Sequence, residues 1–182
     1  MNNNHLVLIS GKSSSGKSAS LMAMDNPEGV MYLNCENGKK LPFKTKFKEL
    51  IVTDPMQVYQ AFEEAEKPMH KDVHTIVIDT LTYLMDMYES TKVLNATNTM
   101  QAWGQYAQYM KQLMSQVVAK STKNVVFLAH TSDILNEAEM VNETLVKVKG
   151  SLMNQGIESF FTTVISTKKL PLTKLDDKVA KS

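Results

Sequence analysis

Near its start the chain reads Gly11-Lys12-Ser13-Ser14-Ser15-Gly16-Lys17-Ser18. This stretch fits the pattern G-x-x-x-x-G-K-[ST]. It follows an apolar run and precedes a segment with helical character, the context in which the pattern forms a phosphate-binding loop. The glycines let the backbone curl so that several N–H groups point inward, and the start of the following helix adds the positive end of its dipole. We therefore predict a loop that holds the phosphates of a nucleotide, ATP.

Two side chains of this loop have predicted chemical roles. Lys17 places a cation on the β- and γ-phosphates, and Ser18 offers its hydroxyl to Mg²⁺. We assign no chemical role to the four other side chains of the loop, although their backbone belongs to the predicted nucleotide-binding stretch. These residues are Lys12, Ser13, Ser14 and Ser15.

A second feature is the short apolar run over residues 75–79, which ends in Asp79. In a fold with a phosphate loop, a carboxylate at such a strand end holds the hydration shell of Mg²⁺, with Ser18 on the other side. The plainer alternative is an aspartate that caps a helix beginning at Leu81. The earlier phosphate loop favours the metal role, and Thr80 is a weaker candidate for positioning a water molecule.

The rest of the chain alternates apolar runs with helical patterns, which indicates an α/β fold with a mostly parallel sheet flanked by helices on both faces. The apolar runs are nearly continuous, as in strands buried on both faces. Strands are expected at residues 5–10, 30–34, 50–53, 75–79, 124–129 and 161–167. Helices are expected from Gly16, Asp54 and Leu81, and along the stripe from Tyr106 to Val117. The acidic stretch 131–150 is expected to be a loop or a hairpin.

Length and composition limit the possible classes. The 182 residues, 43% of them hydrophobic, suit one domain, which we divide into a core over residues 1–169 and a tail over 170–182. The sequence contains no apolar run long enough to span a membrane and no signal peptide, and its lone Cys35 fits a reducing compartment. We therefore expect a cytoplasmic protein without a membrane partner. All 20 basic residues are lysine, and the formal net charge is +1.

Four stretches in this order resemble the core of RecA-like recombinases, and in particular the small phage-encoded RecA-like ATPases of the Sak type, which are single-strand annealing recombinases. The four are the loop 11–18, the run 30–36 ending in Glu36, the run 76–81 containing Asp79, and the run 125–130 ending in His130. The resemblance implies a RecA-like P-loop NTPase fold and an ATPase stimulated by single-stranded DNA. It also implies that Glu36 activates the attacking water and that His130 senses the γ-phosphate and relays it to a DNA-binding loop.

The resemblance further implies partners and a location. These are single-stranded DNA, other copies of the chain in a homo-oligomer, and the host cytoplasm if the protein is phage-encoded. RecA-like assemblies bring basic residues beyond the DNA loop against the neighbouring nucleotide, so Lys168 or Lys169 is a candidate for a cation supplied in trans. A plainer interpretation puts both lysines in a solvated tail. Trp103 is a candidate for stacking on a base or, equally, for anchoring its helix.

Three functions remain open from the sequence. The first is a DNA-dependent ATPase that promotes annealing or strand exchange in phage-type recombination. The second is a nucleotide or small-molecule kinase, which the absence of arginine disfavours because kinases usually clamp phosphoryl groups with guanidinium forks. The third is a nucleotide-gated binding or regulatory module with little turnover, which the presence of both Glu36 and Asp79 disfavours.

Overall fold

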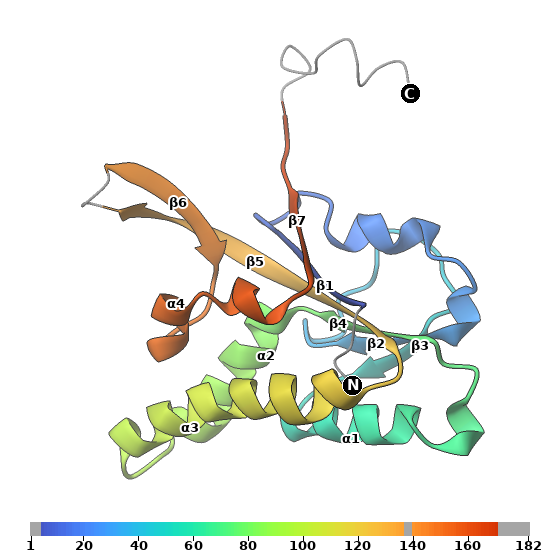
Figure 1. Ribbon diagram of the computed structural model, residues 1–182, viewed down its shortest axis with the longest axis horizontal. Helices are drawn as coiled ribbons and strands as arrows, with labels where there is room; N and C mark the ends of the chain where they lie inside the picture. The colour runs from blue at the N-terminus through green and yellow to red at the C-terminus, as the bar shows by residue number, and fades with distance from the viewer. Residues whose placement is uncertain (1–4, 137–139, 171–182) are drawn as a thin grey trace.

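The computed structural model of the protein describes residues 5–136 and 140–170, and its centre is a mostly parallel sheet (Figure 1). Six parallel strands follow the order β3-β2-β4-β5-β1-β7. Their bounds are β3 Lys48–Ile51, β2 Val30–Asn34, β4 Thr75–Asp79, β5 Asn124–Asn136, β1 Leu6–Gly11 and β7 Thr163–Thr167. The predicted α/β class with a mostly parallel sheet is confirmed.

Helices cover both faces of this sheet, unequally (Figure 1). Three helices pack on one face: α1 Met56–Ala65, α2 Leu81–Tyr88 and α3 Thr99–Gln112. The other face is covered by residues 18–29, which form two short 3₁₀ helices, and by part of the segment 41–47. Successive side chains along β4 point to opposite faces of the sheet and pack against the two layers in turn. Ile76 and Ile78 pack under the three helices, whereas Val77 packs with Leu21 on the other side.

Local sequence explains where α1 begins. Oδ1 of Asp54 accepts a hydrogen bond from the Met56 backbone at 2.8 Å, and Oε1 of Gln57 accepts one from the Asp54 backbone at 3.1 Å. These reciprocal bonds satisfy backbone donors that have no partner within the helix. The expected start at Asp54 is therefore confirmed to within two residues.

The first expected helix differs from the prediction. The helix expected from near Gly16 begins two residues later, because Gly16 has a φ of +101° and lies in the loop. A right-handed helix excludes that backbone conformation. The helix begins instead at Ser18, ends at Ala23 and has 3₁₀ geometry.

The strand expected over residues 124–129 is also longer than predicted. It continues past Ala129 to Asn136 and pairs with the antiparallel strand β6 Val141–Val146, with Thr131 opposite Val146. This hairpin projects from the body of the molecule (Figure 1). Its outer half is largely exposed, so no apolar run marks it in the sequence. Of the two possibilities for residues 131–150, the hairpin is correct, and it is followed by the short helix α4 Ser151–Gln155.

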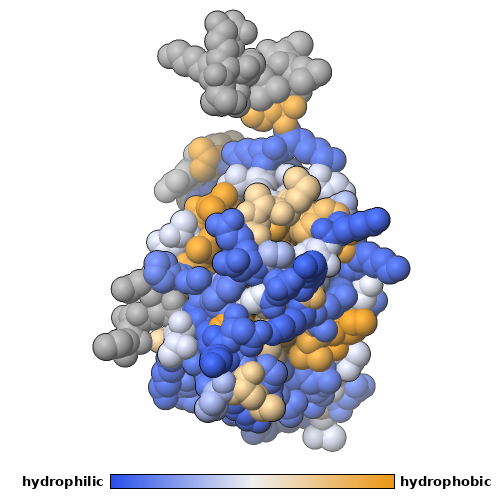
Figure 2. Space-filling model, turned by 90° about the vertical axis from the view of Figure 1, so that its right-hand side faces the viewer, coloured by the Kyte–Doolittle hydropathy of each residue, from blue (hydrophilic) through white to orange (hydrophobic). Residues whose placement is uncertain are grey.

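The surface on the side of residues 18–29 and β3 is largely hydrophilic, with apolar groups in separate small clusters (Figure 2). Among the described residues, no helix is both long enough and apolar enough to cross a bilayer. The division into a core over 1–169 and a tail over 170–182 stays a prediction, because residues 171–182 lie outside the part described.

Candidate functional site

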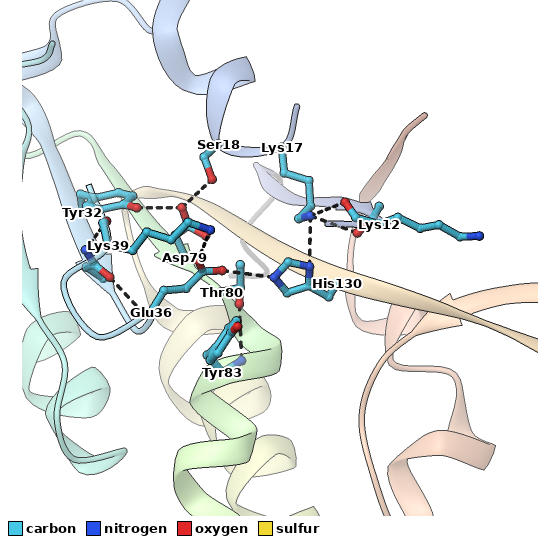
Figure 3. Close-up of polar contacts among 12 residues, drawn as sticks. Lys12, Lys17, Ser18, Tyr32, Glu36, Lys39, Asp79, Thr80, Tyr83 and His130 are labelled. Carbon is cyan, nitrogen blue, oxygen red and sulfur yellow. Dashed lines mark hydrogen bonds and ion pairs between the residues drawn. The ribbon is translucent and has the colours of Figure 1, made fainter. Parts of the chain in front are cut away.

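The predicted site residues come from different strands but gather at one edge of the sheet (Figure 3). The phosphate loop follows β1, Glu36 follows β2, Asp79 ends β4, and His130 lies within β5. Carboxyl ends of parallel strands share one edge of a sheet, which is where ligands bind in open α/β folds. A cavity of about 330 Å³ opens there, and residues of all four segments line it.

Lys17 extends beneath the loop, and its ammonium group has three acceptors. Nζ donates to the carbonyl oxygens of Gly11 at 3.0 Å and Lys12 at 2.9 Å, and it lies 3.3 Å from Nδ1 of His130. Lys17 is 5% exposed. Burial lowers the pKa of this ammonium, while the nearby charges of Glu36 and Asp79 oppose the shift. The cation is thus held at the floor of the cavity, where the predicted exchange of these acceptors for phosphate oxygens would take place.

Ser18 and Asp79 form the second part of the site. Oγ of Ser18 donates to Oδ2 of Asp79 at 2.9 Å, and the hydroxyl of Tyr32 donates to the same oxygen at 2.7 Å. Burial raises the pKa of the Asp79 carboxyl, and these two hydrogen bonds oppose the rise.

The other oxygen of Asp79, Oδ1, is buried without a hydrogen-bond partner among the described residues. An unpaired buried carboxylate oxygen is unfavourable unless a cation or water compensates it. With a hydroxyl beside it, the pair fits a hydrated Mg²⁺, which prefers oxygen ligands and retains several waters. No cluster of three metal-ligating side chains occurs among the described residues, and a Mg²⁺ bound mainly through phosphates does not need one.

Glu36 is paired on both sides. Its Oε1 lies 3.2 Å from Nε2 of His130, and its Oε2 lies 2.9 Å from Nζ of Lys39. The hydrogen bond from His130, helped by the hydrogen bond and charge of Lys39, lowers the pKa of the Glu36 carboxyl to about 2, although burial opposes this. The carboxylate is ionised and points into the site (Figure 3).

His130 lies between the predicted base, Glu36, and the predicted phosphate-binding lysine, Lys17. One tautomer satisfies both contacts: Nε2–H donates to Glu36, and the bare Nδ1 accepts from Lys17. The backbone N–H of His130 donates to Oγ1 of Thr82 at 3.0 Å, and the ring of Tyr83 meets the imidazole edge-on at 5.7 Å. Helix α2 thus fixes the position of His130, and the expectation that His130 ends its strand is wrong because β5 continues beyond it.

The four remaining loop residues divide between two sides of the loop. Ser13 and Ser14 line the phosphate cavity. Lys12 points away from it (Figure 3) and forms an ion pair with Asp133 of the hairpin at 2.5 Å. The hydroxyl of Ser15 lies 2.6 Å from that of Thr167 in β7.

A second cavity, of about 510 Å³, lies on this other side of the loop. Loop residues, the base of the hairpin and the end of β7 line it, and three of its lining residues are lysines: Lys12, Lys168 and Lys169. Gly11 separates the loop from β7 so narrowly that a Cβ there would lie 2.2 Å from Oγ1 of Thr167. Residues of the same loop line both cavities, and Ser13 lines the two together, so the loop separates one cavity from the other.

Sequence reasoning missed two residues of the site. Tyr32 looked like an ordinary strand residue, yet its hydroxyl holds Asp79. Lys39 belonged to a basic run over residues 39–48, and its contact with Glu36 was not expected. Two other lysines of that run are engaged in exposed ion pairs, Lys46 with Glu28 and Lys48 with Asp72.

Trp103 lies within α3 and packs against the core. Its ring meets that of Tyr106 at 5.2 Å, and the position of a Cβ on Gly150 would be 3.3 Å from it. These contacts support the anchoring interpretation of Trp103.

Comparison with known proteins identifies the class. A family model described as an AAA domain matches residues 3–170. The chain belongs to this AAA domain family. Membership makes it an AAA-type P-loop ATPase, a nucleotide-binding protein, and this agrees with the predicted phosphate loop. A comparison with curated proteins finds no match. The family match shows that the chain is an ATPase of the AAA type. It does not show that the chain is a Sak-type recombinase, the group that the sequence resembles.

Proposed function

We propose that this chain is a Mg²⁺-dependent ATPase that binds single-stranded DNA and promotes annealing or strand exchange, in the manner of the phage-encoded RecA-like ATPases it resembles. Membership of the AAA domain family supports the ATPase part. The DNA part rests on the resemblance of the four stretches and on how the phosphate cavity connects to the rest of the fold.

Within the phosphate cavity, each residue has a defined task. Lys17 and the loop backbone bind the phosphates, while Ser18 and Asp79 would hold a hydrated Mg²⁺, which would neutralise charge on the phosphate oxygens. Hydrolysis forms a bond between a water oxygen and the γ-phosphorus and breaks the bond to ADP. Glu36 accepts the proton of that water, directly or through a second water molecule. His130 orients Glu36 at 3.2 Å and contacts Lys17 at 3.3 Å, so it responds to a phosphate that engages either of them.

The observation that carries the DNA part is the continuity of β5. The same strand bears His130 at the phosphate cavity and then runs on to Asn136 in the projecting hairpin (Figure 1). Lys12 of the phosphate loop is paired with Asp133 of that hairpin. A change at the phosphates therefore has two direct connections to the hairpin, one through the backbone of β5 and one through an ion pair. Nucleotide-dependent ordering of a segment is a common form of such coupling.

The second cavity has the chemistry of a site for the DNA backbone. Its lysines offer charge to phosphodiesters, and its hydroxyls offer hydrogen bonds; the hydroxyl residues include Ser13, Thr144 and Ser166. Contacts of this kind give affinity without reading base sequence. Oγ1 of Thr131 is buried there without a hydrogen-bond partner among the described residues, so it is available to a ligand or a water molecule.

One observation favours the nucleotide-gated module as a second candidate. Glu36 is held by both His130 and Lys39, and a carboxylate with a pKa of about 2 is a weak base. If neither partner is released when ATP binds, the chain binds nucleotide with little turnover.

The deciding experiment measures phosphate release with ATP and Mg²⁺, with and without an unstructured oligo-dT, together with filter binding of the same oligonucleotide at low salt. We expect several-fold stimulation and ATP-dependent DNA binding. Turnover without DNA binding would leave the ATPase and remove the recombinase. Tight ATP binding without turnover would establish the module, and phosphate transfer to an acceptor would establish a kinase.

A further inference from the structure

Lys39 reaches Glu36 because residues 36–39 form a tight turn, and the sequence of this turn favours that geometry. Residues 36–39 form a β-turn in which the backbone N–H of Lys39 donates to the carbonyl oxygen of Glu36 at 3.0 Å. The two central residues, Asn37 and Gly38, have φ values of +53° and +73°. Positive φ at both positions is the conformation for which Asn-Gly is the preferred pair. This turn reverses the chain, so that the side chain of Lys39 returns over Glu36.

A buried asparagine fixes both ends of the turn. Oδ1 of Asn34 accepts from the backbone N–H of Glu36 at 3.0 Å, and Nδ2 donates to the carbonyl oxygen of Lys39 at 3.0 Å. The same amide also donates to Oε1 of Glu49 at 2.7 Å, and Asn34 is fully buried. Since Asn34 is the last residue of the buried strand β2, the turn is attached directly to the sheet.

The turn places a second cation at the phosphate cavity. Lys39 and Glu36 line that cavity together with Lys17, and Nζ of Lys39 lies 2.9 Å from Oε2 of Glu36. The Lys39 side chain is 70% exposed, whereas that of Glu36 is 10% exposed, so the lysine approaches from the open side of the cavity. It covers the carboxylate where an incoming phosphate would pass.

The chemistry of phosphoryl transfer calls for such a cation. Charge on the transferred phosphoryl group is usually neutralised by an arginine, and this chain has none. Lys17 is already placed on the loop side of the cavity. We propose that Lys39 is a catalytic cation supplied in cis. When a nucleotide binds, the ammonium group of Lys39 moves from Glu36 to the terminal phosphate, and the carboxylate of Glu36 is then free to activate water. This inference rests on the ATPase activity proposed above.

The exchange explains why a lysine is placed on the predicted base. Without nucleotide, the ammonium group and the carboxylate neutralise each other. A terminal phosphate with more negative charge than Glu36 competes for the ammonium group. Once Lys39 has moved, Glu36 loses one of the two contacts that stabilise its ionised form and becomes a better proton acceptor. ADP lacks the terminal phosphate and does not trigger the exchange.

Nucleotide affinity gives the first test. Fluorescent ATP and ADP analogues are titrated against the parent, Lys39→Ala, Lys39→Arg and, as a matched control, Lys40→Ala. Lys40 lines the same cavity but has no hydrogen bond or ion pair to the described residues. We expect Lys39→Ala to weaken ATP binding by about 10- to 100-fold and to leave ADP binding within about threefold. Lys39→Arg and Lys40→Ala should keep the parental ratio of the two affinities. An unchanged ratio in Lys39→Ala would overturn the proposal, because a lysine that only positions Glu36 does not distinguish ATP from ADP.

Turnover gives the second test. Lys39→Ala should hydrolyse bound ATP about 10²- to 10³-fold more slowly than the parent, as expected for the loss of one charge-stabilising donor. Because the cation acts in cis, mixing Lys39→Ala with Lys17→Ala should restore no activity; recovery in the mixture would overturn the cis assignment. The affinity test needs no turnover. If the parent protein binds ATP without hydrolysing it, the proposed ATPase activity is wrong. The contact of Lys39 with the terminal phosphate would still be tested by the ratio of ATP affinity to ADP affinity in Lys39→Ala.

Discussion

Nε2 of His130 lies 3.2 Å from Oε1 of Glu36, a contact between segments that are not neighbours in the sheet. Glu36 follows β2 and His130 belongs to β5, and β4 lies between these two strands. The contact therefore passes over the end of β4, where Asp79 is held by Ser18. The proposed acid-base pair, Glu36 with His130, and the proposed metal-binding pair, Ser18 with Asp79, therefore lie side by side in one cavity, where a terminal phosphate would meet both.

Lys17→Ala removes the cation at the floor of the phosphate cavity. We expect ATP affinity and hydrolysis both to fall steeply, because no other side chain of the loop places a charge there. The fold should persist, as judged by circular dichroism, since the variant leaves the sheet untouched. Lys71→Ala, at an exposed lysine elsewhere, is the control. ATP binding equal to that of the parent in a calorimetric titration would contradict the assignment of the nucleotide site.

Glu36→Gln preserves the shape of the side chain but cannot accept the proton of water. Hydrolysis should fall by roughly 10²- to 10⁴-fold while ATP affinity stays close to that of the parent. Glu63→Gln is a matched control, because Glu63 is exposed on α1 and lies outside the phosphate cavity. If turnover of Glu36→Gln remains within a few-fold of the parent, another residue is the base.

His130→Ala should raise the pKa of Glu36 from about 2 towards its ordinary value of 4.5, because the hydrogen bond from His130 is the largest cause of the depression. A carboxyl whose pKa is depressed by folding stabilises the folded state above its unfolded pKa, and this contribution is lost as the pH falls towards the folded pKa. The variant should therefore lose part of the stability that the parent keeps between about pH 5 and 7. A carbon-13 NMR titration of the Glu36 carboxyl measures the shift directly. His70→Ala, which removes a partly buried contact with Glu64 away from the site, is the control, and a Glu36 pKa still near 2 in His130→Ala would refute the assignment.

Much of the fold could be predicted because buried parallel strands are marked by their composition. The run at 75–79 and its terminal Asp79 follow from apolar continuity and one polar end, and the structure has them at the expected residues. The edge strand was misplaced by two residues, because Lys48 and Glu49 belong to it and are exposed. An exposed strand is polar and lacks the pattern used to recognise strands.

The assembly of the site was predictable only in part. The order of the motifs indicated that the loop, Glu36, Asp79 and His130 share one end of the sheet. The contact between Lys39 and Glu36 depends on the turn geometry at Asn37-Gly38 and on the amide of Asn34. The Asn-Gly pair is a strong indicator of a tight turn, but neither that pair nor Asn34 indicates by itself that the turn brings Lys39 onto Glu36. The ion pair of Lys12 with Asp133 depends on a hairpin whose extent the sequence left open.

Binding of single-stranded DNA should weaken steeply with salt. If the three lysines of the second cavity contact phosphodiesters, the logarithm of affinity should fall linearly with the logarithm of salt concentration, with a slope of about −0.7 per contact for single strands. Lys12→Ala should reduce the slope by about one contact and affect all base compositions equally. Lys120→Ala, at an exposed residue just before the start of β5 that does not line this cavity, should leave the slope unchanged. A salt-independent affinity, or no binding at low salt with ATP present, would argue against this site.

The last prediction concerns Lys168 and Lys169, which line the second cavity and not the cavity that contains Lys17. Because neither lysine lines the nucleotide cavity of its own chain, either one could take part in ATP hydrolysis only by reaching the nucleotide of a neighbouring copy. If one of them neutralises the phosphoryl group of that neighbour, specific activity should rise with protein concentration, because an isolated chain lacks the cation. A double variant, Lys168→Ala with Lys169→Ala, should then lose basal turnover, and mixing it with Lys17→Ala should restore part of the activity, since each chain supplies what the other lacks. A role limited to the DNA backbone gives a different result: the double variant keeps basal turnover and loses only stimulation by oligo-dT. Normal basal activity of the double variant, or no recovery in any mixture, would exclude the cation supplied in trans and leave the DNA contact as the function of these two lysines.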